Sequence, residues 1–148
     1  MDTSHLSDQL NDLLKRNYDA AKGYRKAAEH VDSPELASFM ESYAQQRDSF
    51  VRELRTLVSG LGGKPQDEKD IPGSLHHAWM DLKAAFSSND DEAMLEECIR
   101  GEKAAIKEYK EVLGDTTLPT NVSAILRDQM TKIEEALHRV EELEDQYD

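Results

Sequence analysis

A chain of 148 residues with 38% hydrophobic and 33% charged residues has the length of one domain and the composition of amphipathic helices with narrow buried stripes. The formal net charge of −13 argues against nucleic acid and against an anionic membrane as partners, because little positive charge is available to bind phosphate. A single cysteine, Cys98, rules out an internal disulfide. Together with an N-terminus that lacks a secretory pattern, it favours the cytoplasm.

The first two predicted helices form a hairpin. Apolar residues that recur at three- and four-residue steps predict a helix over residues 4–31. Ser33 suits an N-cap and Pro34 suits the first helical position, so a second helix is predicted over 34–61. A Gly-Gly pair ends this helix.

The second half of the chain repeats this plan after a long connection. A polar loop with two prolines covers residues 64–73, and a short helix over 74–87 carries its large apolar residues on one face. Two further long helices are predicted over 90–113 and 119–146. No segment has the alternation of a strand. The sequence therefore predicts an all-α, single-domain, ferritin-like four-helix bundle, whose two hairpins are joined by a long crossover connection containing a short extra helix.

The two hairpins also share a faint sequence repeat. Asn17 precedes Tyr24 by seven residues in the first helix, and Glu102 precedes Tyr109 by the same spacing in the third. Each tyrosine lies within a similar run of alanine and lysine residues. Such strings are common in helices, so the repeat alone only hints at a duplicated hairpin.

Several polar residues fall in the phase of the buried stripes. Arg47 lies in phase with the apolar residues of the second helix and Glu102 with those of the third, while Glu134 lies at the edge of the fourth stripe. A buried charge needs a partner, so we expect Arg47 and Glu102 to pair, directly or through tyrosine hydroxyls. The alternative is that Glu134 and even Arg47 extend to solvent from the edge of the stripe. The predicted buried network consists of Asn17, Tyr24, Arg47, Glu102, Tyr109 and Glu134.

Three runs of residues resemble the hairpins of rubrerythrin-type ferritin-like proteins. They are Tyr24 to Glu29, Ala44 to Arg47, and Gly101 to Ile106. Over nearly its full length, the chain is still more similar to an uncharacterised bacterial branch of that superfamily. That likeness is carried mainly by Asn17-Tyr18-Asp19, Leu61-Gly62-Gly63-Lys64-Pro65 and the segment from Leu75 to Lys83.

The resemblance implies a dismantled metal site. Di-iron members of the superfamily place one Glu on each of two helices and a Glu-x-x-His on each of the other two. Only two of these six ligand positions keep a carboxylate in this chain, and neither histidine is present. The corresponding positions are Asn17, Arg47, Phe50, Glu102, Glu134 and Leu137. We therefore expect no metal ion and no cofactor.

Other candidate sites have simpler interpretations. Glu135 and His138 form a literal Glu-x-x-His, but both point away from the predicted stripe and fit a solvated face. His76 and His77 stand beside Trp79 and could form a binding patch. Adjacent histidines on a helix diverge, so a capping helix is the simpler interpretation.

These features favour a protein that is not an enzyme. We expect a structural or interaction protein, of the stress-related kind that the resemblance implies, with an unknown protein partner or with itself as a partner, as a monomer or a dimer. The alternative is a residual metal-binding protein or oxidase that uses Glu102 and Glu134. A small-ligand carrier is neither supported nor excluded by the sequence.

Overall fold

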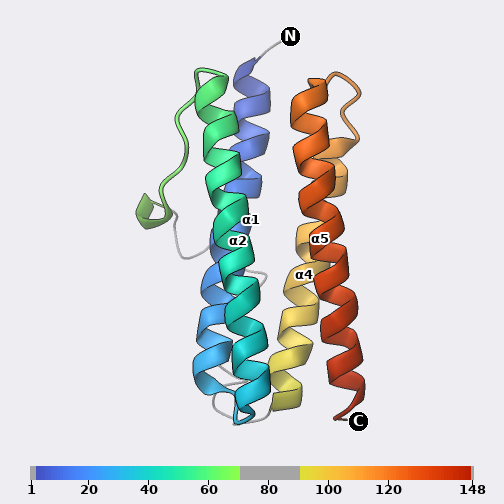
Figure 1. The fold of residues 1–148 in the computed structure, drawn as a ribbon. Helices are drawn as coiled ribbons and strands as arrows, with labels where there is room; N and C mark the ends of the chain where they lie inside the picture. The colour runs from blue at the N-terminus through green and yellow to red at the C-terminus, as the bar shows by residue number, and fades with distance from the viewer. Residues whose placement is uncertain (1–2, 71–90, 148) are drawn as a thin grey trace.

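The computed structural model describes residues 3–70 and 91–147, and in these ranges the chain is all-α (Figure 1). The elements are α1 (Thr3–His30), α2 (Pro34–Gly60), the short 3₁₀ helix η1 (Glu68–Asp70), α4 (Asp91–Leu113) and α5 (Thr120–Asp145). Each long helix begins and ends within one residue of its predicted range. The short helix predicted over 74–87, with His76, His77 and Trp79, lies outside the described residues.

The four long helices pack as two antiparallel hairpins. α1 pairs with α2 and α4 pairs with α5, while α1 packs against α4 across the two hairpins. α2 ends at the end of the bundle where α1 begins, whereas α4 begins at the opposite end (Figure 1). This is the connectivity of the predicted ferritin-like crossover bundle.

The turn between α1 and α2 is tied to the second hairpin. The Ser33 hydroxyl accepts a hydrogen bond from the Leu36 amide at 3.3 Å, and Pro34 follows it as the first helical residue. The Asp91 carboxylate at the start of α4 accepts from the Asp32 amide at 2.9 Å and from the Ser33 amide at 3.3 Å. The two hairpins are therefore joined by hydrogen bonds at this end of the bundle.

α2 ends in a tight glycine turn. Gly62 has a φ of 80°, which favours glycine, and the Gly63 amide donates to the Val58 carbonyl at 3.0 Å. A Cβ on Gly63 would lie 2.6 Å from the Ser7 hydroxyl oxygen. The chain therefore leaves α2 in close contact with α1, and any side chain at position 63 would require Ser7 to shift.

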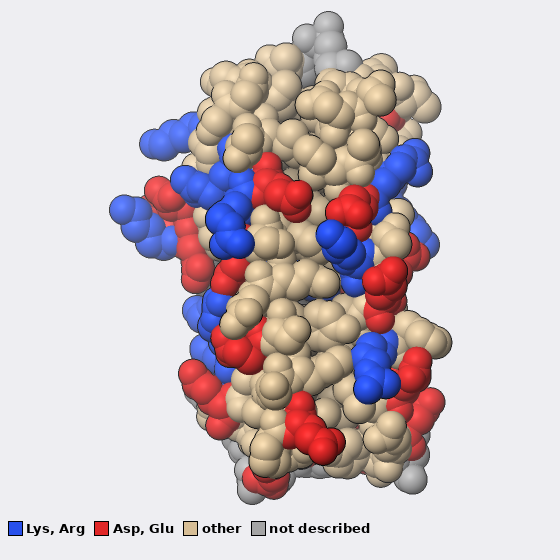
Figure 2. All heavy atoms as spheres, viewed as in Figure 1, with Lys and Arg blue, Asp and Glu red and all other residues tan. Residues whose placement is uncertain are grey.

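The core contains polar residues among the apolar ones. Most buried side chains are aliphatic, aromatic or alanine, and they form two clusters along the bundle. Among the residues that the structure describes, Arg47 has the largest fully buried side chain. Outside the core, Lys and Arg side chains are interspersed with Asp and Glu on the face formed by α2 and α5 (Figure 2). In the described ranges, no helix has the length and apolar character needed to span a bilayer.

Candidate functional site

The centre of the bundle holds a buried ion pair between α2 and α4. The Arg47 guanidinium donates through Nη1 to Glu102 Oε1 and through Nη2 to Glu102 Oε2, both at 2.5 Å. Both side chains are 0% exposed. The two parallel hydrogen bonds match the planar guanidinium to the planar carboxylate, which is the strongest geometry for such a pair. The predicted pairing of Arg47 with Glu102 is confirmed.

The groups around this pair complete its polar and aromatic contacts. The Tyr24 hydroxyl donates to Glu102 Oε2 at 2.9 Å, and Arg47 Nε donates to Gln46 Oε1 at 3.2 Å. The Arg47 Cζ atom lies 5.7 Å from the ring centre of Tyr24 and 5.8 Å from that of Phe50. Two aromatic rings therefore face the guanidinium in addition to the carboxylate. Phe50 supplies one of them at the position where the resemblance places a histidine.

Burial and the ion pair act on the pKa values of Arg47 and Tyr24. Burial lowers the pKa of Arg47, but the Glu102 carboxylate outweighs it, so the pKa of the guanidinium lies above its ordinary value. Burial, and then the negative charge of Glu102, raises the pKa of the Tyr24 hydroxyl well above its ordinary value. Arg47 is therefore protonated and Tyr24 neutral across the physiological pH range, and neither can act as a base there.

A second buried network connects all four long helices. Asn17 Nδ2 on α1 donates to the Tyr109 hydroxyl on α4 and to the Leu13 carbonyl, each at 2.8 Å. The Tyr109 hydroxyl donates to Gln129 Oε1 on α5 at 2.7 Å. Gln129 Nε2 then donates to Glu53 Oε1 on α2 at 3.1 Å. The network begins at a fully buried level and ends at an exposed carboxylate.

The two networks explain the sequence repeat. Tyr24 of α1 bonds to Glu102 of α4, and Tyr109 of α4 bonds to Asn17 of α1. Because the two helices are antiparallel neighbours, equal seven-residue spacings bring each tyrosine opposite the first residue of the other repeat. The repeated pairs thus face each other across the junction of the two hairpins.

Glu134 is not part of either network, so its predicted place in the site was wrong. Glu134 is exposed, and Met130 and Leu137, the large apolar residues that flank it in the sequence, are only partly buried. The buried stripe follows alternating steps of four and three residues through Val122, Leu126, Gln129, Ile133, Ala136 and Val140. This regular spacing is the signal that could have identified Gln129, which the sequence prediction missed.

The literal Glu-x-x-His of α5 lies on a solvated face, as predicted, whereas His76 and His77 lie outside the described residues. Glu135 and His138 are exposed, and His138 Nε2 lies 2.9 Å from Glu142 Oε1 one turn further along α5. Cys98 is fully buried, and burial raises the pKa of its thiol well above the ordinary value. A buried, protonated thiol is a core residue and not a nucleophile.

Comparison with known proteins supports the same fold. The family model described as Domain of unknown function (DUF2383) matches residues 5–115. The chain belongs to this family. A solved structure with a similar fold is the bacterioferritin-related protein from Bacteroides fragilis, described as a dodecameric thioferritin. It is 20% identical, with a TM-score of 0.77 over 96% of this chain and 85% of that chain. The fold of this DUF2383 chain is therefore ferritin-like. No curated protein matches it.

The residues of the buried centre do not fit a di-iron group. Such a group needs several carboxylates and imidazoles as ligands, whereas Glu102 is a single carboxylate whose oxygens already accept from Arg47 and Tyr24. No histidine is buried in the part of the chain that the structure describes. The one grouping of three possible ligand side chains in the described ranges comprises Glu92, Glu96 and Glu144, none of which belongs to this centre.

Proposed function

We propose that this DUF2383 chain is a non-enzymatic ferritin-like bundle, in which a guanidinium–carboxylate network stands in place of the di-metal centre, and that it works as a structural or interaction protein in stress physiology. The observation that carries the proposal is the two-point Arg47–Glu102 pair, with both side chains withdrawn from solvent. The positive charge that metal ions would supply to the core is here part of the polypeptide.

Electrostatics supports the first part of the proposal. A metal cation that reached Glu102 would lie within a few ångströms of the Arg47 guanidinium, in a medium where like charges repel strongly. To admit the cation, Arg47 would have to leave, and a buried arginine without its partner is costly. The Glu102 carboxylate is therefore occupied by its ion pair with Arg47 and is not available as a metal ligand.

The alternative is a residual metal centre that uses Glu102 and Glu134, and the positions of these two residues do not support it. Glu102 is fully buried between the helices, whereas Glu134 lies on the exposed face of α5. The residue of α5 that reaches the buried level is Gln129, whose neutral amide is a weaker metal ligand than a carboxylate.

Elemental analysis tests the proposal directly. The full chain, without a histidine tag or chelators, is expressed in medium supplemented with iron and zinc and measured beside an Arg47→Ala variant and an Arg52→Ala control. Arg52 is an exposed arginine of the same helix. The expected result for the unmodified chain and the control is less than about a tenth of an equivalent of metal. One or two tightly held equivalents in the unmodified chain would overturn the proposal.

A further inference from the structure

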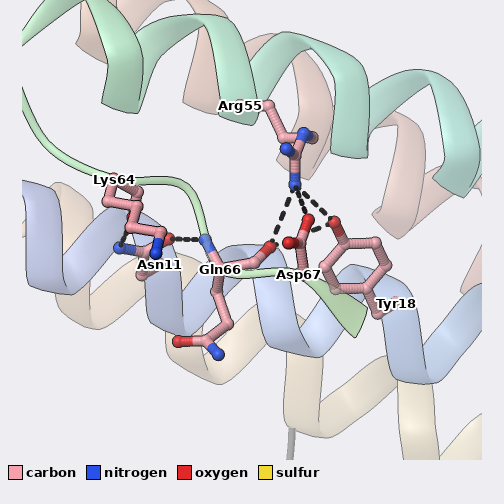
Figure 3. A network of polar contacts seen from close by, with 6 residues as sticks. All are labelled: Asn11, Tyr18, Arg55, Lys64, Gln66 and Asp67. Atoms are coloured by element: carbon pink, nitrogen blue, oxygen red, sulfur yellow. Dashed lines mark hydrogen bonds and ion pairs between the residues drawn. The ribbon is translucent and has the colours of Figure 1, made fainter. Parts of the chain in front are cut away.

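The chain segment that follows α2 is held by side chains of the first hairpin. Asn11 of α1 binds its backbone at two points: Nδ2 donates to the Lys64 carbonyl at 3.1 Å, and Oδ1 accepts from the Gln66 amide at 2.8 Å (Figure 3). An amide side chain that pairs with an N–H and a C=O two residues apart imitates one rung of a sheet. Asn11 therefore contacts backbone atoms of the segment and not its side chains.

Two more residues complete this arrangement. The Tyr18 hydroxyl donates to the Gln66 carbonyl at 3.1 Å. Arg55 of α2 directs Nη1 at the same carbonyl at 3.1 Å, at the Tyr18 hydroxyl at 2.9 Å and at Asp67 Oδ1 at 3.2 Å (Figure 3). Both backbone groups of Gln66 are thus bound by side chains, and α1 and α2 each contribute.

This contact lies at the point where the chain leaves the first hairpin. Residues 63–67 form no helix or strand, so their path depends on these side chains and on the Gly62 turn. Beyond them the chain continues to α4, which begins at the other end of the bundle (Figure 1). The first few residues after α2 therefore set the direction in which the chain leaves the first hairpin.

We propose that Asn11, Tyr18 and Arg55 form a backbone clamp that keeps the second hairpin packed on the first hairpin of the same chain. Without the clamp, the hairpin would be free to pack on a second copy. The contacts between the hairpins are the same in both arrangements, so only the connecting segment distinguishes them. A fixed exit direction raises the local concentration of the chain's own second hairpin and favours pairing within one molecule.

The buried networks make exchange the expected outcome when the clamp fails. Arg47 lies on the first hairpin and Glu102 on the second, so a hairpin that detaches leaves a charged core residue without its partner. Pairing again with a complete hairpin restores this ion pair and recovers the lost free energy of folding. The connecting segment still tethers the chain's own second hairpin, so the hairpin of another chain, which offers the same contacts, competes with it at high protein concentration.

The test compares full-length proteins that differ only at the clamp. We would prepare the unmodified chain, the Asn11→Ala/Arg55→Ala variant and an Asp12→Ala/Arg52→Ala control, which removes exposed neighbours on the same two helices. Isotopically light and heavy samples of each are mixed at high concentration just below the melting temperature and examined by native mass spectrometry. The clamp variant should form mixed light–heavy dimers at about tenfold higher yield than the other two.

Two further measurements separate hairpin exchange from other effects. Exchanged dimers must open a hairpin interface to dissociate, so they should persist for hours after dilution, whereas surface dimers separate at once. Hydrogen exchange of the Gln66 amide should accelerate about tenfold in Asn11→Ala, because this amide loses its acceptor. Tyr18→Phe, which removes only a hydroxyl, serves if the double variant does not fold. Equal yields of persistent dimer in the clamp variant and the control, or an unchanged Gln66 exchange rate, would overturn the proposal.

Discussion

Replacing Arg47 with methionine is the most direct test of the buried centre. The side chain fits a similar volume, but Glu102 loses both of its 2.5 Å charge-assisted hydrogen bonds and keeps only the one from Tyr24. Because both partners are 0% exposed, water cannot replace the lost donors. Breaking a buried pair from one side costs about 3–5 kcal/mol of folding free energy, and we expect Arg47→Met to fall in that range.

Urea unfolding followed by circular dichroism measures this loss, with Arg52→Met as the exposed control on the same helix. Removing the carboxylate as well, in Arg47→Met/Glu102→Leu, should recover most of the stability, because no buried charge is left unpaired. A loss below about 1 kcal/mol in Arg47→Met is the size of effect seen at exposed ion pairs and would refute the reasoning. A double variant no more stable than the single one would mean that the cost arises from packing and not from charge.

Three other predictions concern the turn, the thiol and the tyrosines. Gly62→Ala should destabilise the fold by about 1 kcal/mol, because the backbone of Gly62 has a positive φ. Gly60→Ala is the control: a Cβ at Gly60 meets open space, so this variant should be neutral or stabilising by up to about 1 kcal/mol in the same urea assay. Cys98 should react with a thiol reagent at about pH 8 only at the rate of unfolding, because burial raises the pKa of its thiol; rapid labelling of the folded chain would contradict this. Burial also raises the pKa of Tyr24 and of Tyr109, so the folded state holds their protons more tightly than the unfolded state. Stability should then be fully present below about pH 10 and fall as the pH rises further, and urea melts across that range that show no decline would contradict the burial.

The helices could be predicted from the sequence because their signals are local. Three- and four-residue steps of apolar residues locate each helix, and Ser33, Pro34 and the glycine turn mark the ends of the first two. The placement of Arg47 and Glu102 on facing stripes followed from the same periodicity. Their pairing could be predicted because two buried charges of opposite sign have few other ways to be stabilised.

The fourth helix shows where this reasoning fails. α5 has large apolar residues on both flanks of its stripe, including Met130 and Leu137, and periodicity alone cannot tell a flank from the centre. The structure selects the line through Gln129 because its amide has two partners there, the Tyr109 hydroxyl and the Glu53 carboxylate. Those partners belong to α4 and α2, so their positions are set by tertiary packing. This information is not local to the sequence of α5.

The reciprocal contacts between α1 and α4 also fix the register in which the two hairpins pack. A slip of one helical turn along this junction would separate Tyr24 from Glu102 and Asn17 from Tyr109 at the same time. It would also break the pair that Glu102 makes with Arg47 and leave buried polar groups unsatisfied at two levels of the bundle. Apolar side chains tolerate such a slip far better, because their contacts have no fixed direction. The directional contacts of the polar core therefore favour one arrangement of the four helices over slipped ones.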